Sequence, residues 1–149
     1  MSAKREQIQD ALLTRLRLQV PGLISTNRRY VGVSELAALQ QPALSVVAVS
    51  GMAARAPGMP PRWTQHAMAI LYVREPADMA LTVETQLFAL MDLVEGALQL
   101  QPREQNFDDI TTTLGGLVRY CHHANWVLHH GLGEGQAGAS LSIEMLALQ

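Results

Sequence analysis

Hydrophobic residues recur at helical spacing near the start of the chain. Ile8, Leu12 and Leu16 follow a four-residue step, which predicts an amphipathic helix over residues 3–18. Leu18 is expected to widen the apolar stripe of this helix, together with Ala11. The side chains expected on the polar side are those of Lys4, Arg5, Glu6, Gln9, Asp10 and Arg17.

A second stretch, residues 79–98, repeats its apolar positions at steps of three and four. This pattern predicts the longest helix of the chain, about 30 Å at 1.5 Å per residue, lying across one face of a sheet. Its apolar positions are Val83, Leu87, Leu90, Met91, Val94 and Leu98.

Five other stretches have the patterns of strands. Residues 24–33 are polar on both faces, which is typical of an edge strand. Residues 43–49 form a short valine-rich run that predicts a central strand. Residues 62–74 alternate between apolar and polar positions. The runs 113–130 and 139–148 predict a long C-terminal strand pair joined by a glycine-rich turn.

The segment between two of these strands, GMAARAPGMPP at residues 51–61, is rich in glycine and proline. Such a composition is expected to exclude both helix and strand pairing. Residues 43–74 therefore predict a hairpin with a long flexible tip, and Arg55 and Arg62 give this tip a positive charge. Loops of this length without structure of their own are usually functional or flexible.

The C-terminal pair is long for a domain of this size. An unbroken strand from Leu117 to His130 would span about 45 Å, against a domain diameter of roughly 35–40 Å. The strand must therefore bend or project from the body. The side chains expected on its core face are those of Val118, Tyr120, Ala124, Trp126 and Leu128, and those expected opposite are Arg119, His123, Asn125 and His129.

These elements predict one domain over residues 1–149. Its fold class is α+β, with a mixed, mainly antiparallel β-sheet with long hairpins, flanked by two main helices on one face. The strand–helix–strand unit between Trp63 and Val127 is expected to form a right-handed crossover, which would make part of the sheet parallel.

The amino-acid composition limits the classes of function that this chain could have. The 149 residues are 48% hydrophobic and only 16% charged, which favours a folded chain with surface buried against partners. The net charge of −2 is too small to indicate a specific nucleic-acid binder. One cysteine, Cys121, excludes a disulfide framework. The N-terminus lacks the pattern of a signal peptide, and no run approaches the length of a membrane span.

The histidines near Cys121 suggest metal or nucleophile chemistry, but their spacing disfavours both. On a regular strand Cys121, His123 and His129 share one face, and His122 and His130 share the other. His123 and His129 would then lie about 20 Å apart, whereas zinc ligands converge within about 2.3 Å of the ion. We expect no enzyme activity, no metal and no cofactor. His129 and His130 could make an assembly contact sensitive to pH.

The order of segments resembles a known family. It runs from REQIQDALLTRL through VPGLISTNRRYV and QPALSVVAVS to the glycine- and proline-rich tip and RWTQHAMAILYVR. It continues with LFALMDLVEGAL and TLGGLVRYC, and ends with SLSIEMLAL. The chain is similar over nearly its whole length to the small tail-terminator proteins of long-tailed bacteriophages, the minor tail protein U-like group. The segment CHHANWVLHH departs from that pattern, because it is richer in histidine and less acidic.

The resemblance implies a structural virion protein. Such a protein forms a ring, commonly a hexamer, that caps the tail tube, ends its polymerisation and provides the surface for head–tail joining. Its partners would be further copies of itself, the tail tube protein and a head-completion or neck protein. It would bind no membrane and no specific nucleic acid, although DNA could pass through the lumen. It would reside at the head-proximal end of the tail in the virion, and in the host cytoplasm during assembly.

Two other functions stay open from the sequence: another neck or head-completion protein of a phage, and a small cytosolic ligand-binding dimer. Under the ring hypothesis, projecting strands and the flexible tip are expected to make the contacts between subunits or with the tube. The residues expected to make these contacts are Arg28, Arg29, Arg55, Met59, Arg62, Arg119, His123, Asn125 and His129.

Overall fold

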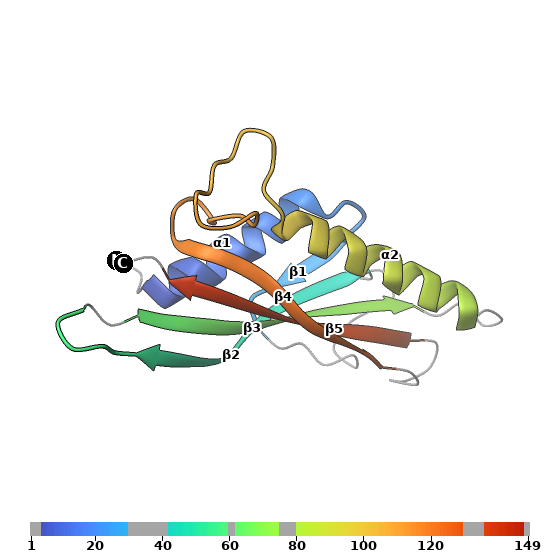
Figure 1. Cartoon of the computed structure of the whole chain (residues 1–149). Helices are drawn as coiled ribbons and strands as arrows, with labels where there is room; N and C mark the ends of the chain where they lie inside the picture. Colours follow the sequence, from blue (N-terminus) through green and yellow to red (C-terminus); the bar gives the residue numbers. More distant parts are fainter. Residues whose placement is uncertain (1–3, 30–41, 60–61, 75–79, 130–135, 148–149) are drawn as a thin grey trace.

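The structure is a computed structural model that describes residues 4–29, 42–59, 62–74, 80–129 and 136–147. Within these residues two helices, α1 and α2, pack on one face of a five-stranded sheet (Figure 1). The sheet is mixed and mostly antiparallel, with the order β1-β2-β3-β5-β4. The predicted α+β fold class is therefore confirmed.

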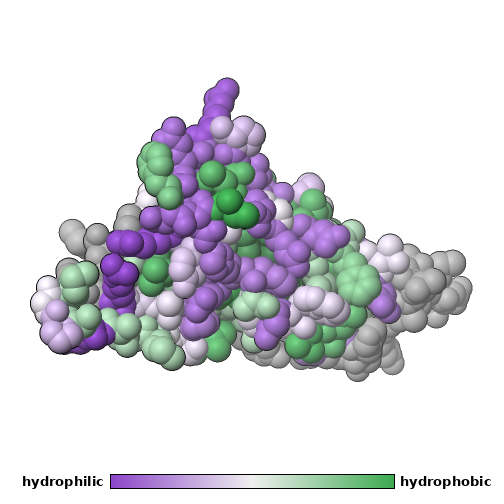
Figure 2. All heavy atoms as spheres, in the orientation of Figure 1, coloured by the Kyte–Doolittle hydropathy of each residue, from purple (hydrophilic) through white to green (hydrophobic). Residues whose placement is uncertain are grey.

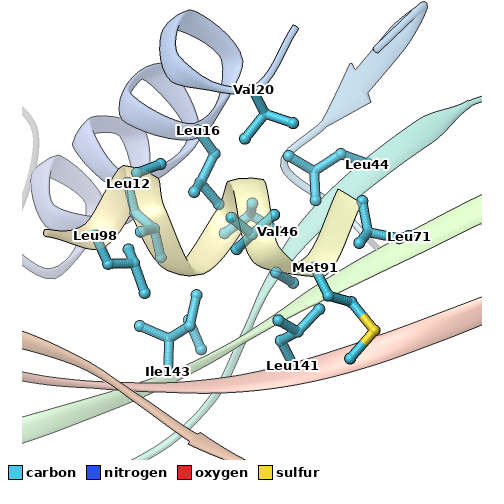
Figure 3. Close-up of a cluster of buried hydrophobic side chains, with 14 of the residues drawn as sticks. Leu12, Leu16, Val20, Leu44, Val46, Leu71, Met91, Leu98, Leu141 and Ile143 are labelled. Atoms are coloured by element: carbon cyan, nitrogen blue, oxygen red, sulfur yellow. The ribbon is translucent and has the colours of Figure 1, made fainter. Parts of the chain in front are cut away.

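Both helices form where their hydrophobic periodicity predicts them. Helix α1 spans Lys4–Gln19 and buries Ile8, Leu12 and Leu16 completely. Helix α2 spans Ala80–Leu98 and buries Leu87, Leu90, Met91, Val94 and Leu98, as expected; Ala97, which was not among the expected positions, is also buried. Figure 3 shows side chains of both helices meeting those of the sheet in one core, in which Leu44, Leu71, Leu141 and Ile143 supply the sheet side.

Two positions of α1 differ from the expected pattern. Leu18 is 76% exposed and does not widen the buried stripe. Gln9, which was expected on the polar side, is buried at 2% exposure. The reason is that α1 packs over both the sheet and α2, so its buried surface is broader than the stripe of apolar residues and includes position 9.

The sheet is built mainly from three long antiparallel pairings. Strand β2 (Ala43–Ala54) pairs with β3 (Arg62–Arg74), which confirms the predicted hairpin. Strand β5 (Gln136–Ala147) pairs with β3 on one side and with β4 (Val118–His129) on the other. The remaining strand, β1 (Ser25–Asn27), is shorter than predicted and pairs with β2 in parallel at Ala43–Ser45. Residues 30–33 of its predicted range lie outside the described residues.

The expected parallel pairing after the crossover is not formed. Strands β3 and β4 run in the same direction, but β5 lies between them and pairs with both. The parallel pair of the sheet is instead β1 with β2. The sequence pattern identified the strand–helix–strand unit but carried no information on which strand would fill the space between its two strands.

The prediction that residues 51–61 form an unpaired loop is partly wrong. Gly51–Ala54 belong to β2 and pair with Arg62–Gln65 of β3. A glycine suits this ladder because a Cβ at Gly51 would lie only 3.0 Å from the carbonyl oxygen of Thr64. The tip is therefore shorter than expected, and a turn within it is closed by a hydrogen bond from the Met59 amide to the Ala56 carbonyl, 3.0 Å long. Residues 60 and 61 lie outside the described residues.

The C-terminal strand pair also differs from its predicted form. Thr113–Leu117 form a turn instead of a strand, since Leu114, Gly115 and Gly116 all have positive φ angles of 50°, 73° and 89°. Strand β4 then contains two β-bulges, between Val118 and Tyr120 and between His123 and Asn125. At each bulge the alternation of side chains between the two faces shifts by one residue. A simple alternation therefore cannot assign the faces correctly along the whole strand.

The bulges change which side chains of β4 point toward the helices. Cys121, His123, Trp126 and Leu128 are paired with helix-facing residues of β5, whereas Tyr120 is paired on the other face. The expectation was correct for Val118, Trp126 and Leu128. It was wrong for Tyr120 and His123, and for Ala124, which is the bulged residue and is exposed.

Candidate subunit-interaction surfaces

The contact residues predicted from the sequence lie in three separate regions. Arg28 and Arg29 follow β1, beyond the last strand residue, Asn27. Arg55, Met59 and Arg62 lie at the tip of the β2–β3 hairpin. Four further residues, Arg119, His123, Asn125 and His129, lie along β4. The structure therefore does not bring them together into one site.

The hairpin tip is a coherent surface of its own. The far end of the β2–β3 hairpin extends beyond the helices (Figure 1). Arg55, Met59 and Arg62 line a hollow of about 260 Å³ together with Ala54 and Ala56. The sequence from Val49 to Thr64 contains two arginines and no acidic residue. This end of the molecule therefore presents positive charge beside an exposed methionine.

The four predicted residues of β4 have different environments. Arg119 is the bulged residue, and its carbonyl accepts a 2.8 Å hydrogen bond from the Asn106 side chain. The His123 Nδ1 atom lies 3.4 Å from a carboxylate oxygen of Glu95 on α2. Asn125 is exposed on the face away from the helices. The His129 ring lies 2.9 Å from the Ser140 hydroxyl on that same face.

Three histidines contact acidic side chains. The His122 ring is hydrogen-bonded to the Asp109 carboxylate and stacks on Tyr120, with ring centroids 4.1 Å apart. This contact with His122 holds the pKa of Asp109 below its ordinary value. His66 lies 3.8 Å from Glu144.

The alternation along β4 suggested that one face carries Cys121, His123 and His129. They do not share one face, because the bulge at Ala124 separates His129 from the other two. His130 lies outside the described residues.

The connection between α2 and β4 is fixed by a polar network around Arg15. Its guanidinium bonds both carboxylate oxygens of Glu104, at 2.6 and 2.8 Å, and the Ala97 carbonyl at 2.7 Å. Thr112 donates a further hydrogen bond of 3.0 Å to Glu104. The hydrogen bond from Arg15 is the main cause that lowers the pKa of Glu104. The connection is therefore well anchored, although it contains no helix or long strand.

This anchored connection carries two exposed hydrophobic side chains. Phe107 is 95% exposed and Ile110 is 73% exposed. Figure 2 shows hydrophobic side chains interrupting the mostly hydrophilic surface over this projecting part of the molecule. These two exposed side chains make the connection a candidate contact surface.

A groove lies between the N-terminal half of α1 and the middle of β2. Its volume is about 360 Å³, and Gln9, Gln65 and Trp63 are among the residues that line it. Ala48, Val49, Ser50 and Gly51 of β2 form its strand side. Neither side-chain polar atom of Gln9 has a hydrogen-bond partner among the described residues, and the same holds for Gln65 Oε1 and Trp63 Nε1.

Charged residues of α1, together with Arg28 after β1, border this groove. Arg28 forms ion pairs with Asp10 and, at 3.5 Å, with Glu6. The guanidinium of Arg5 lies 5.0 Å from the centre of the Trp63 ring, as in a cation–π contact. Gln65 is also held in place, because its Nε2 atom donates a 3.1 Å hydrogen bond to the Arg5 carbonyl. The walls of the groove are thus fixed, while the Gln9 amide and the Gln65 Oε1 atom lack partners among the described residues.

Sequence reasoning missed the groove because Gln9 was assigned to the solvent side of α1. A signal for it was present in β3, where Gln65 shares the alternating face of Trp63, Ala67 and Ala69. A glutamine in an otherwise apolar face indicates either a buried hydrogen bond or a binding position. The position of α1 over this glutamine could not be obtained from the helical periodicity of α1 or from the alternation of β3 alone.

Both open edges of the sheet carry exposed hydrophobic side chains. In the described residues β1 pairs only with Ala43–Ser45, which leaves the rest of the outer edge of β2 without a strand. Val49 and Met52 on this strand are 56% and 70% exposed. At the opposite edge, Trp126 and Val127 of β4 are 47% and 53% exposed. Edge strands usually avoid such side chains because they favour pairing with other chains.

The remaining chemistry-bearing groups are few. Among the described residues, no three His, Cys, Asp or Glu side chains are grouped in a way that could hold a metal ion. Cys121 is completely buried, and burial raises the pKa of its thiol to about 12. No helix of the described part of the chain is long and apolar enough to cross a membrane.

Comparison of the chain with protein-family models finds no match, and a comparison with curated proteins finds none either.

Proposed function

We propose that this chain is a structural protein of a phage tail. It forms a ring that caps the tail tube, ends the polymerisation of the tube and provides the surface for head–tail joining. The order of segments described above supports this function. The observation that carries it is that, among the described residues, each outer edge of one sheet has a stretch that pairs with no strand and exposes hydrophobic side chains.

The two different edges can supply the two surfaces that a ring requires. A ring forms when one surface of each subunit binds a different surface of the next and the rotation closes. Strand β2 is antiparallel to β3, β3 to β5 and β5 to β4, so β2 and β4 run in opposite directions. The β4 edge of one copy can therefore continue the sheet of the next copy as an antiparallel neighbour of β2.

The other exposed surfaces are left for further partners. The hairpin tip, with Arg55, Met59 and Arg62, projects beyond the helices and is suited to reach the tail tube or the lumen. The connection with Phe107 and Ile110 offers a second hydrophobic surface, which we assign to the head-completion protein.

Light scattering of the purified chain tests the ring. The expected mass is several times that of the 16.3 kDa chain, and about six times for a hexamer. A chain that stays monomeric, alone and when mixed with tail tubes, would contradict the proposal. A dimer with a small molecule bound in the groove between α1 and β2 would instead favour the ligand-binding function. A ring that binds phage heads but leaves tube ends bare would indicate a neck protein.

A further inference from the structure

We propose that the groove between α1 and β2 is a binding site for strand β4 of a neighbouring copy, with Trp126 of that copy as the inserted side chain. This inference rests on the proposed ring and specifies which residues join its subunits. It starts from Gln9 and Gln65, which are 2% and 5% exposed and line the groove.

Buried amide groups without partners are costly. Leaving a buried donor or acceptor unpaired costs about 1–3 kcal/mol, and most such groups in native proteins are paired. Gln9 Oε1, Gln9 Nε2 and Gln65 Oε1 lack partners within the described residues, and Trp63 Nε1 lies beside the same groove. Several such atoms around one cavity indicate a site that is completed by a group other than the described residues.

The place of the groove in the sheet indicates what completes it. Ala48–Gly51 form its strand side, and they lie beyond the three residues of β2 that pair with β1. Val49 is a bulged residue, so an extended segment lying against this part of β2 would pair with its backbone on either side of the bulge. That segment would pass directly beside the groove, so its helix-facing side chains would enter it.

Strand β4 of a second copy fits this description. It is the strand at the other edge of the same sheet. The connection covers the start of this edge, because the Arg119 carbonyl accepts from Asn106 and the Cys121 amide donates to the Thr111 hydroxyl. From Ala124 onward no strand of the described residues pairs with its outer side, and its direction makes the new pair antiparallel. Trp126 points to the helix side, because it pairs with buried Leu141 and contacts Phe88 of α2 edge-on at 5.8 Å. Its half-exposed indole supplies an N–H donor, and the free oxygens of Gln9 and Gln65 are acceptors.

Cysteine cross-linking between two variants tests the pairing. Ser50 of β2 and Asn125 of β4 are both exposed and both lie on the face away from the helices. Mixing Ser50→Cys chains with Asn125→Cys chains under mild oxidation is expected to give disulfide-linked dimers. A chain carrying both changes should give a ladder up to the subunit number of the ring. The native thiol of Cys121 does not compete, because it is buried and its pKa is raised to about 12.

The matched control pairs Ser50→Cys with Asp92→Cys, an exposed position on α2, and it is expected to give no cross-link. Rings that form without the Ser50–Asn125 link would overturn this inference and leave the proposed function standing. Failure of the chain to form rings at all would instead contradict the proposed function.

Two substitutions test the groove itself. Gln9→Leu removes unpaired buried polar atoms, so the melting temperature of the dissociated chain should stay equal or rise. Ring association should weaken about tenfold, the equivalent of one hydrogen bond. Trp126→Ala should weaken association more strongly, since it removes the inserted side chain. Gln86→Leu, at an exposed position of α2, is the control and should change neither. Unchanged association in Gln9→Leu and Trp126→Ala would show that the groove has only a structural role.

Discussion

At the scale of single residues, burial decides which positions tolerate change, and two neighbouring positions of α2 show this directly. Val94 is completely buried against the sheet, whereas Leu93 beside it is 38% exposed. A charge placed at position 94 would have no partner in the core, but at position 93 it would remain in water.

Val94→Asp is therefore expected to lower the free energy of unfolding by roughly 4 kcal/mol or more, enough to unfold most small domains. Leu93→Asp should change it by less than about 1 kcal/mol. Urea denaturation followed by circular dichroism measures both. A Val94→Asp chain as stable as the parent would show that the assigned core face of α2 is wrong.

The ion pair of Arg15 with Glu104 predicts a dependence of stability on pH. The pKa of Glu104 is lowered in the folded chain by the hydrogen bond from Arg15, from an ordinary value of 4.5. The stability that this carboxylate contributes is therefore fully present above about pH 4.5. It is lost as the pH falls through the lowered folded pKa.

Glu104→Gln should remove this contribution. The variant is expected to be less stable than the parent by about 1–2 kcal/mol near pH 7. The two stability curves should converge as the pH falls below the folded pKa of Glu104. Thermal melts between pH 2.5 and pH 7 measure the difference. A constant difference across this range would show that the ionised form of Glu104 is not what holds the connection.

At the scale of elements, the sequence predicted what depends on periodicity and missed what depends on tertiary packing. The steps of Ile8, Leu12 and Leu16, and the alternation of β3, located α1 and β3 to within about one residue. The two bulges of β4 leave no mark in the hydrophobic pattern, so the faces of Tyr120 and His123 were assigned wrongly.

The candidate surfaces were predictable to a smaller extent. The hairpin tip could be found because arginine, methionine and proline are concentrated there. The groove could not, because it depends on how α1 lies across β2 and β3. The open edges depend on strand order, and the insertion of β5 between β3 and β4 could not be obtained from periodicity.

The hairpin tip is expected to act in tube binding and not in folding. Arg55→Glu combined with Arg62→Glu reverses the charge of a surface that is exposed in the free chain. The melting temperature should change by less than about 2 °C and rings should still form, but binding to tail tubes should be lost, as measured by co-sedimentation. The matched control is Arg17→Glu with Arg103→Glu, which changes the net charge equally at exposed positions elsewhere. Equal tube binding by both double variants would show that the tip makes no tube contact.

At the scale of the whole molecule, the described residues form a single sheet with helices on one face and with part of each outer edge unpaired. The core of α1, α2 and the helix side of the sheet stabilises the chain alone (Figure 3). The edges, the hairpin tip and much of the 99–117 connection lie outside this core, and we propose that they contact other chains. In this account the subunits join through their sheet edges and leave the hairpin tips free to contact the tube.

The most direct test is a negative-stain image of tail tubes after incubation with the purified chain. The tubes are assembled from the tail-tube protein encoded in the same genome, and fresh tube protein is then added. The account predicts a ring on one end of each tube and no further growth from that end. Bare ends that continue to grow in the presence of the chain would contradict it.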